Sequence, residues 1–347
     1  MSAKGKISYS SPSNIAIIKY WGKQPGNQIP MNPSVSMTLD KCRSFTTIEY
    51  EVKELCEPSL EVYFAGSRAT DIEAKLQKWF DKIAGIFPWL SCARLRIETR
   101  NNFPHSAGIA SSASGMSALA MCLSGIDEHI GHEGKHTKEF HSNIARLGSG
   151  SASRSVTGPW VLWGESKFFP GSANDHVINI PDIHADFVYL HDTIIVVDKQ
   201  PKSISSRQGH SLMDAHPYRS GRIKQTEDNL SRLTQALKTG DWNTFSLITE
   251  NEALSLHALM LASEGGMMLW RGDTIEWMHF LRQQRQKTGI PLTFTLDAGA
   301  NIHLLYPPWV HKEIVQILAA APVGSIEFIH DHTGTGPEKL NDDYEQN

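Results

Sequence analysis

The sequence has little cysteine, no long apolar run and no marked excess of charge of either sign. Its 347 residues include four cysteines and no CxxC pair, so we expect reduced, mostly structural thiols in a cytoplasmic protein. No apolar run approaches the roughly 20 residues that span a bilayer, and the opening residues MSAKGKISYSSPS lack the apolar core of a secretory signal. A membrane partner is therefore not expected, and the formal net charge of −4 gives no general reason to expect nucleic acid.

Familiar metal-ligand motifs are also missing, although histidine is abundant. The 16 histidines form no HExxH or similar spacing. Their tightest cluster is His330-Asp331-His332, for which the sequence favours a polar loop over a metal site.

Length and composition indicate a globular protein with two packed lobes. A chain of 347 residues, 40% hydrophobic and 20% charged, is too long for one ordinary core. Apolar stretches predict strands over 15–18, 44–52, 60–64, 93–98, 160–163, 193–197 and 292–296. Helical periodicity predicts helices over 71–86, from 111 to about 123, before 148, and over 218–238, 242–263 and 274–288. The chain turns polar near Pro181-Asp182, and we place the lobe boundary close to residue 187.

The segment SNIAIIKYWGKQ places a lysine at the end of a strand that is apolar on both faces. Alternation sends Ile15 and Ile17 to one face and Ala16 and Ile18 to the other, which is the pattern of a buried strand. Lys19 follows directly, where a cation is costly unless an anion meets it. Two interpretations remain open: the side chain extends from the strand end into water, or it binds a buried anion.

A stretch of small residues, NNFPHSAGIASSASGMSALA, covers Asn101 to Ala120. Small residues allow backbone amides to approach an anion, and the N-terminus of the following helix adds unsatisfied N–H groups and a positive dipole. Ser111 and Ser112 can offer hydroxyl ligands to a phosphate or to Mg²⁺. The stretch is neither a Walker loop nor a GxGxxG motif, and a tight loop before a closely packed helix explains it equally well.

Three further segments place a charged or small polar group beside a turn. In ARLGSGSASRS (145–155), the GSGS run can form a second cradle of backbone amides, and Arg154 is a planar double donor for carboxylate or phosphate. In TFTLDAGANIHLLY (293–306), Asp297 ends a buried strand, where a general base or metal ligand is often placed. In KSISSRQGHS (202–211), Arg207 can supply a further anion contact. Ordinary alternatives are a helix-to-strand turn, an Asp that caps a turn and a solvated loop, respectively.

Taken together, these segments resemble the mevalonate diphosphate decarboxylases, within the superfamily of galactokinase, homoserine kinase, mevalonate kinase and phosphomevalonate kinase (the GHMP kinases). The resemblance covers nearly the whole chain in order, through NIAIIKYWGK, NPSVSMTLD, NNFPHSAGIASSASG, GSGSASRS, SSRQGH and LDAGAN. It implies a two-lobe α+β fold, with a left-handed βαβ crossover in the N-terminal lobe (residues 1–187) and Asp297 in the C-terminal lobe (residues 188–347). It also implies a reaction in which ATP and (R)-5-diphosphomevalonate give isopentenyl diphosphate, CO₂, ADP and phosphate.

The resemblance also implies roles for individual residues. Asp297 resembles the catalytic aspartate that orients or deprotonates the 3-hydroxyl, Lys19 the lysine paired with it, and Arg154 the arginine that grips the substrate carboxylate and the neighbouring Asp. The charge of Lys19 would favour the ionised form of Asp297 and stabilise the phosphate as it forms on the 3-hydroxyl. Further substrate contacts are expected at Ala16, Tyr20, Trp21, Gly22, Lys23, Ser149, Gly150, Ser151 and Arg207. The ATP phosphates are expected at Ser106, Ala107, Gly108, Ser111 and Ser112, with Mg²⁺ at Ser112.

The number of phosphates on the substrate stays open, because the sequence departs from the family pattern at Pro33, His105 and His210. The nearest alternatives are a relative that acts on 5-phosphomevalonate and one that phosphorylates the 3-hydroxyl without decarboxylation. A catalytically inactive ligand-binding homologue is a more distant alternative. The presence of Lys19, Arg154 and Asp297 together favours the decarboxylase over these two relatives. The same three charges argue against the inactive homologue, since unpaired buried charges are costly to keep without use. The family resemblance further suggests a homodimer.

Overall fold

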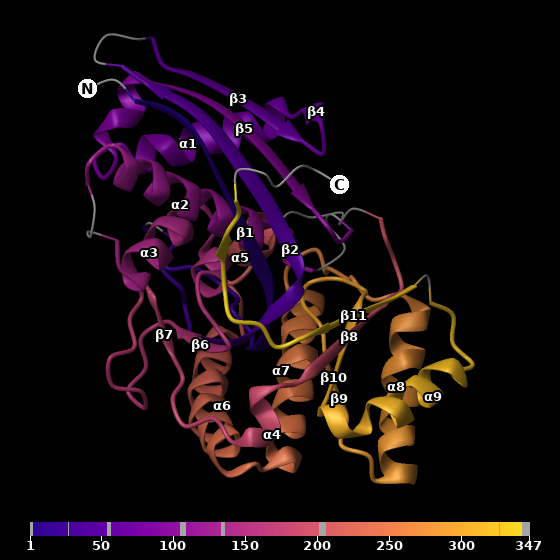
Figure 1. The fold of residues 1–347 in the computed structure, drawn as a ribbon. Helices are drawn as coiled ribbons and strands as arrows, with labels where there is room; N and C mark the ends of the chain where they lie inside the picture. The colour runs from indigo at the N-terminus through magenta and orange to yellow at the C-terminus, as the bar shows by residue number, and fades with distance from the viewer. Residues whose placement is uncertain are drawn as a thin grey trace.

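The protein has an α+β fold, as the resemblance implies, built from two sheets and flanking helices (Figure 1). The computed structural model describes residues 3–26, 28–53, 57–104, 109–132, 136–200, 206–325 and 327–341, with the backbone alone at 206 and 207. The strands are β1 (Ala3–Ile18), β2 (Ser34–Val52), β3 (Ser59–Phe64), β4 (Ser67–Arg68), β5 (Ala93–Asn101), β6 (Trp160–Trp163), β7 (Val177–Asn179), β8 (His191–Val196), β9 (Thr293–Thr295), β10 (Ile302–Tyr306), β11 (Glu327–His332) and β12 (Glu338–Lys339). The α-helices are α1 (Thr70–Ile83), α2 (Ser111–His129), α3 (Lys138–Gly148), α4 (Ala185–Val188), α5 (Ser206–Ser211), α6 (Arg219–Thr239), α7 (Trp242–Ala262), α8 (Gly272–Thr288) and α9 (His311–Ala319). The 3₁₀ helices are η1 (Pro88–Cys92), η2 (Gly150–Ser155) and η3 (Pro308–Val310).

The larger sheet contains the long antiparallel pair β1 and β2 at its centre. Its strand order is β12-β1-β2-β5-β3-β4, and β6 and β7 extend from β2. The neighbours β3 and β5 are parallel and are joined through α1, which is the βαβ connection that the resemblance implies. Helices α1, α2 and α3 cover one face of this sheet (Figure 1). The core between them contains Ile48, Ile97, Trp79 and Leu123.

The smaller sheet is antiparallel, in the order β11-β8-β10-β9. Helix α8 packs on β9, and Trp277 of α8 shares a core with Phe294, Leu304 and Ile314. Helix α7 contacts β9 of the smaller sheet and β1 of the larger one, with α6 beside it (Figure 1). One helix therefore lies against strands of both sheets.

The two halves of the chain share a second core. It includes Ile17 of β1, Trp160 of β6, Ile194 of β8 and Leu233 of α6. Strand β12, close to the end of the described chain, returns to pair with β1. The lobe boundary near residue 187 falls in α4, and it stays a prediction.

Most of the predicted elements are present, with some differences in extent. The strand 160–163 and the end of the helix at 288 agree with the prediction, whereas β1 and β2 are much longer than the predicted segments 15–18 and 44–52. The polar loop predicted at His330-Asp331-His332 is wrong, because these residues end β11. Asp331 is buried there, and its carboxylate accepts the backbone N–H groups of Asp40, Lys41 and Cys42 at 2.6–3.0 Å. Among the described residues, no helix is both long enough and apolar enough to cross a membrane.

Candidate active site

Lys19 and Asp297 meet where β1 ends. Lys19 directly follows β1 and is 1% exposed, and its Nζ donates to Asp297 Oδ1 at 2.7 Å. Asp297 lies in the turn after β9, and its side chain keeps 25% of its surface exposed. The structure thus brings the two residues together, and the interpretation of Lys19 as a side chain that extends into water is wrong.

The charge on Lys19 depends on its neighbours. Burial lowers its pKa, because a buried ammonium loses its hydration. The charge and the hydrogen bond of Asp297 act in the opposite direction, as does the charge of Glu252, whereas Arg154 repels the ammonium. Carboxylates from two parts of the fold therefore favour the cationic form of Lys19.

Arg154 is a second buried cation of the site. It lies in η2, where its Nε donates to Asn14 Oδ1 at 3.2 Å and its Nη1 donates to Ser34 Oγ at 2.9 Å. Its guanidinium carbon is 5.8 Å from the centroid of the Tyr20 ring. Burial lowers the pKa of Arg154 to about 10, so the side chain is charged at neutral pH. Side chains of β1 and β2 hold the guanidinium in place.

A pocket of about 340 Å³ opens beside these charges, a volume typical of small-molecule sites. The predicted site residues that line it are Ala16, Lys19, Tyr20, Trp21, Lys23, Ser112, Ser149, Gly150, Ser151, Arg154 and Asp297. Gly22 and Ser111 adjoin lining residues in the chain. The predicted residues Ser106, Ala107 and Gly108 lie outside the described residues, and Arg207 is described only as backbone in α5.

Tyr20, Trp21 and His210 form an aromatic wall of the pocket. The ring centroid of His210 is 4.3 Å from that of Tyr20 and 5.0 Å from that of Trp21. His210 Nδ1 accepts the N–H of Gly22 at 3.0 Å, and the φ of +94° at Gly22 favours glycine. Burial lowers the pKa of His210 to about 3, so the imidazole is neutral and its Nε2 carries the proton.

Tyr20 also brings an unpaired hydroxyl to the pocket. Within the described part of the chain, the buried Tyr20 Oη has no hydrogen-bond partner. Buried hydroxyls are normally paired, so a ligand in the pocket can supply the missing partner.

Ser149 joins α3 to η2, and Gly150 and Ser151 are the first residues of η2. The hydroxyl oxygens of Ser149 and Ser151 lie 3.3 Å apart, and Asn14 Nδ2 donates to the Ser151 carbonyl at 3.4 Å. A Cβ at Gly150 would lie 2.8 Å from Tyr20 Oη, so only glycine fits there without displacing the tyrosine. The backbone between the two serine hydroxyls thus packs closely against the Tyr20 hydroxyl.

The first turn of α2 also faces the pocket, through Ser112. Ser111 is the first residue of the helix, after Ala110 in the left-handed conformation (φ 42°, ψ 41°). The Ala110 side chain cannot accept a hydrogen bond, so it does not compete with an anion for the first helical amides. This turn can hold a phosphate, as its composition suggested.

Helix α1 contributes a row of lysines that the sequence analysis missed. Lys75, Lys78 and Lys82 line the pocket together with Trp79. Their spacing of three and four residues places them on one side of the helix. This spacing is the only feature of the sequence that could have indicated a shared function. Such a row is more often a solvated face, and only the packing of α1 against α3 brings it to the site.

Metal-binding side chains of the usual kinds do not gather here. Within the described ranges, no group of three or more His, Cys, Asp and Glu is arranged to hold a metal ion. Magnesium typically keeps its waters and binds through few protein ligands plus substrate phosphates. A hydroxyl such as that of Ser112 fits this mode.

Comparison with known families gives matches over both halves of the chain. Residues 11–173 match the family model of the diphosphomevalonate decarboxylase-like N-terminal domain. Residues 193–342 match the model of the mevalonate 5-diphosphate decarboxylase C-terminal domain.

Individual relatives and solved structures agree with these matches. The diphosphomevalonate decarboxylase of Ganoderma lucidum is 33% identical over 335 residues, covering 89% of this chain and 80% of its own. The phosphomevalonate decarboxylase of Haloferax volcanii is 27% identical, covering 83% and 84%, respectively. The mevalonate diphosphate decarboxylase structure from Staphylococcus aureus superposes with a TM-score of 0.84 at 26% identity, covering 98% of this chain and 99% of that one. A complex of MDDEF with MVAPP, AMPPCP and magnesium gives a TM-score of 0.82 at 27% identity, covering 97% and 99%.

Proposed function

The chain belongs to the mevalonate diphosphate decarboxylase family, and on that premise we propose that it catalyses the ATP-dependent decarboxylation of (R)-5-diphosphomevalonate. The products are isopentenyl diphosphate, CO₂, ADP and phosphate. The observation that carries this proposal is the 2.7 Å contact between Lys19 Nζ and Asp297 Oδ1 at the edge of the pocket, with Arg154 beside it. A carboxylate and two cations are the groups that a phosphoryl transfer followed by decarboxylation needs.

The first step is phosphoryl transfer to the 3-hydroxyl. Asp297 accepts the hydroxyl proton while the oxygen attacks the γ-phosphorus of ATP, and the bond from that phosphorus to the ADP oxygen breaks. The Lys19 ammonium stabilises the negative charge that gathers on the transferred group. Because Lys19 is buried, its charge is screened little by water.

The second step removes the phosphate and the carboxylate. The carbon–oxygen bond breaks with its electron pair leaving on phosphate, and positive charge develops at the tertiary carbon. The electrons of the bond to the carboxylate then form the double bond, and CO₂ leaves. Arg154 holds the carboxylate in line for this step through its two-pronged guanidinium.

The remaining pocket residues bind the two ends of the reactants. The diphosphate end of the substrate is bound by Tyr20, Lys23, Ser149, Ser151 and Arg207. The Tyr20 hydroxyl, which has no hydrogen-bond partner among the described residues, supports this. The contacts with ATP phosphates are assigned to Ser106, Ala107, Gly108, Ser111, Ser112, Lys75, Lys78 and Lys82. Ser112 would hold Mg²⁺ together with the ATP phosphates, and the ion would supply neutralisation of phosphate charge.

One experiment distinguishes this function from the alternative activities. Purified protein is given ATP and Mg²⁺ with mevalonate, its 5-phosphate or its 5-diphosphate, and release of ADP and of CO₂ is measured in parallel. We expect equal amounts of ADP and CO₂ with the 5-diphosphate. Preference for the 5-phosphate would indicate a phosphomevalonate decarboxylase, as in the Haloferax relative. ADP without CO₂ would indicate a 3-kinase, and no ADP with any substrate would refute an enzymatic role.

Assembly, lobes and location complete the proposal. The family resemblance supports a homodimer, which light scattering after size-exclusion chromatography would test. Within the described residues, Cys42 and Cys122 are buried free thiols, which supports a cytoplasmic location that imaging of a tagged protein would test. The family models that match on either side of residue 187 support two lobes, 1–187 and 188–347. Limited proteolysis would test that boundary.

A further inference from the structure

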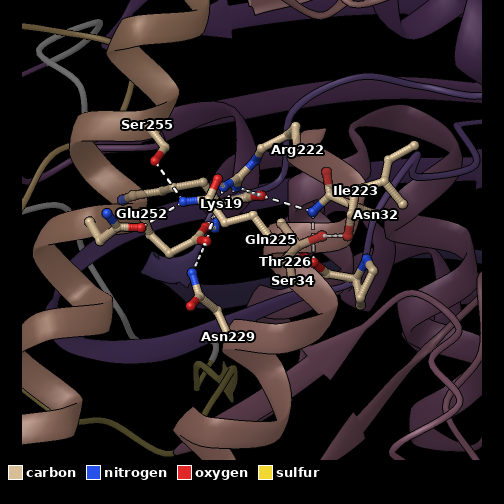
Figure 2. Close-up of polar contacts among 12 residues, drawn as sticks. Lys19, Asn32, Ser34, Arg222, Ile223, Gln225, Thr226, Asn229, Glu252 and Ser255 are labelled. Carbon is tan, nitrogen blue, oxygen red and sulfur yellow. Dashed lines mark hydrogen bonds and ion pairs between the residues drawn. The ribbon is translucent and has the colours of Figure 1, made fainter. Parts of the chain in front are cut away.

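The main chain of Lys19 is held by a buried ion pair from two helices of the second half of the chain. Its N–H donates to Glu252 Oε2 at 2.9 Å, and its carbonyl accepts from Arg222 Nη2 at 3.0 Å. Arg222 lies on α6 and Glu252 on α7, and the two side chains surround Lys19 in Figure 2. Both polar groups of the Lys19 backbone are therefore bound by one salt bridge.

The ion pair itself is almost completely buried and closely bonded. The side chains of Arg222 and Glu252 are 1% and 0% exposed, and they make two contacts of 2.6 and 3.0 Å. Asn229 donates to Glu252 Oε1 at 2.7 Å, and Asn32 donates to the Lys19 carbonyl at 3.0 Å (Figure 2). These bonds connect β1 and the segment before β2 to α6 and α7.

Stability alone is a poor explanation for such a pair. The desolvation of two charges costs several kcal/mol each, and well-packed apolar side chains at such a position are often as stable or more stable. The Nε of Arg222 is buried with no hydrogen-bond partner in the described part of the chain, which adds to that cost. The bonds between this ion pair and the backbone of Lys19 point to a function other than stability.

Helix α7 also holds the partner of Lys19. His257, 2% exposed, lies 3.0 Å through its Nε2 from the backbone carbonyl of Asp297. Its ring stacks on Trp270 at 4.7 Å between centroids. One helix thus contacts the main chains of both Lys19 and Asp297, which come from different sheets.

We propose that Glu252 and Arg222 are positioning residues, which fix the main chain of Lys19 so that its ammonium stays aligned with Asp297 and with the transferred phosphoryl group. The inference rests on the proposed function, and it adds two residues that are not among those lining the pocket. Its physical basis is that a reacting group displaced by about 1 Å can cost roughly a hundredfold in rate. The chain leaves regular structure immediately after Ile18, so β1 itself does not fix Lys19.

Glu252 also contributes to the charge around Lys19. The charged groups that act on Lys19 are Asp297 from the turn after β9, Glu252 from α7, Arg154 from η2 and Asp192 from β8, with Arg222 bonded to Glu252. Glu252 opposes the lowering of the Lys19 pKa that burial causes. Loss of the Glu252 charge therefore lowers the Lys19 pKa further, and this should be visible in the pH dependence of the rate.

The test compares Glu252→Gln with a matched control on the same helix. Glu250 is also buried on α7, and it pairs with Arg282 at 2.8 Å and with Arg285 at 2.5 Å, away from Lys19. We expect Glu252→Gln to lower kcat by roughly tenfold to a hundredfold with less than about a threefold change in the KM of either substrate. The alkaline limb of its kcat profile should move to lower pH. Glu250→Gln should lose thermal stability and keep the wild-type kcat and pH profile.

A second variant guards against misfolding of the first. Arg222→Met combined with Glu252→Leu leaves no unpaired charge, and we expect a cooperatively unfolding protein with the same loss of kcat. The inference is overturned if the double variant keeps the wild-type kcat, or if Glu252→Gln and Glu250→Gln behave alike at matched folded fraction. A wild type that turns over no mevalonate derivative would refute the proposed function instead, so the two failures are distinguishable.

Discussion

Lys19 and Asp297 lie 278 residues apart in the sequence, yet their Nζ and Oδ1 atoms are 2.7 Å apart in the fold. Lys19 follows β1 of the larger sheet, and Asp297 follows β9 of the smaller one. The pair exists only where the two sheets meet, at the helix α7 that contacts both. Any change in how the sheets pack should therefore alter the pair before it alters either sheet.

Arg154→Lys should be a poor enzyme although it keeps the positive charge. An ammonium cannot donate to Asn14 and Ser34 and also grip a carboxylate in two places. We expect kcat/KM to fall by roughly tenfold to a hundredfold, as for one lost charge-assisted bond of about 1.5–3 kcal/mol. Steady-state kinetics would show this, with Arg146→Lys as control, because Arg146 is a buried arginine of α3 that does not line the pocket. Unchanged kinetics would make Arg154 a structural residue.

Sequence patterns were sufficient for elements whose periodicity is strong. Apolar residues form the strand segments Ile15–Ile18 and Trp160–Trp163, as predicted. In α1 they recur at helical spacing. The prediction of a loop at 330–332 is wrong, because backbone amides of β2 donate to the Asp331 carboxylate and allow it to be buried in a strand. Only the folded chain brings those amides to Asp331.

The candidate site was predictable to a different degree for different residues. Family resemblance indicated Lys19, Arg154 and Asp297, because their motifs are local in sequence. Arg222 and Glu252 lie on long helices where a charge is normally solvated, so no local pattern marks them as buried. Their role depends on a contact with Lys19 across 203 and 233 residues of sequence, and only the structure reveals it.

The lysine row of α1 should contribute to nucleotide binding. We expect the double variant Lys78→Ala with Lys82→Ala to raise the KM for ATP by roughly tenfold and to leave the KM for the mevalonate substrate within about threefold. The effect should shrink at high salt, because the lysines are exposed. Lys224→Ala with Lys312→Ala removes two exposed lysines elsewhere and serves as control. Equal ATP KM values for the two double variants would remove α1 from the site.

The cations that bind the phosphate end of the substrate should determine whether the 5-diphosphate or the 5-phosphate is preferred. Lys23 lines the pocket, and Arg207 is predicted to join it there. We expect kcat/KM for the 5-diphosphate to exceed that for the 5-phosphate by roughly tenfold or more, as for one charge-assisted contact worth about 1.5–3 kcal/mol. Arg207→Ala should reduce this preference mainly through KM, since a remote contact is shared by ground and transition states. If Arg207→Ala changed kcat for the two substrates to different extents and left both KM values unchanged, that role would be contradicted.

The free energy of unfolding should fall as the pH drops below the usual pKa of histidine. Burial lowers the pKa of His210 to about 3 and those of His141 and His191 to about 4, from the usual 6.5. The unfolded chain thus binds more protons than the folded one from about pH 6.5 downward, so the folded state loses stability between about pH 6.5 and 3. Urea midpoints at several pH values would measure this, and His141→Gln with His191→Gln should flatten the dependence. An unchanged slope in that variant would assign the acid sensitivity to other groups.

The most direct test of the account is the turnover of Asp297→Asn. The amide has nearly the same shape as the carboxylate, but it cannot accept the hydroxyl proton or form the ion pair with Lys19. We predict a folded protein that binds ATP with near wild-type affinity by calorimetry. We also predict that its release of ADP and CO₂ from 5-diphosphomevalonate is slower by roughly a thousandfold or more, whereas Asp228→Asn, an exposed carboxylate of α6, keeps full activity. A kcat for Asp297→Asn close to that of the wild type would contradict the central claim that this carboxylate, paired with Lys19, carries the chemistry.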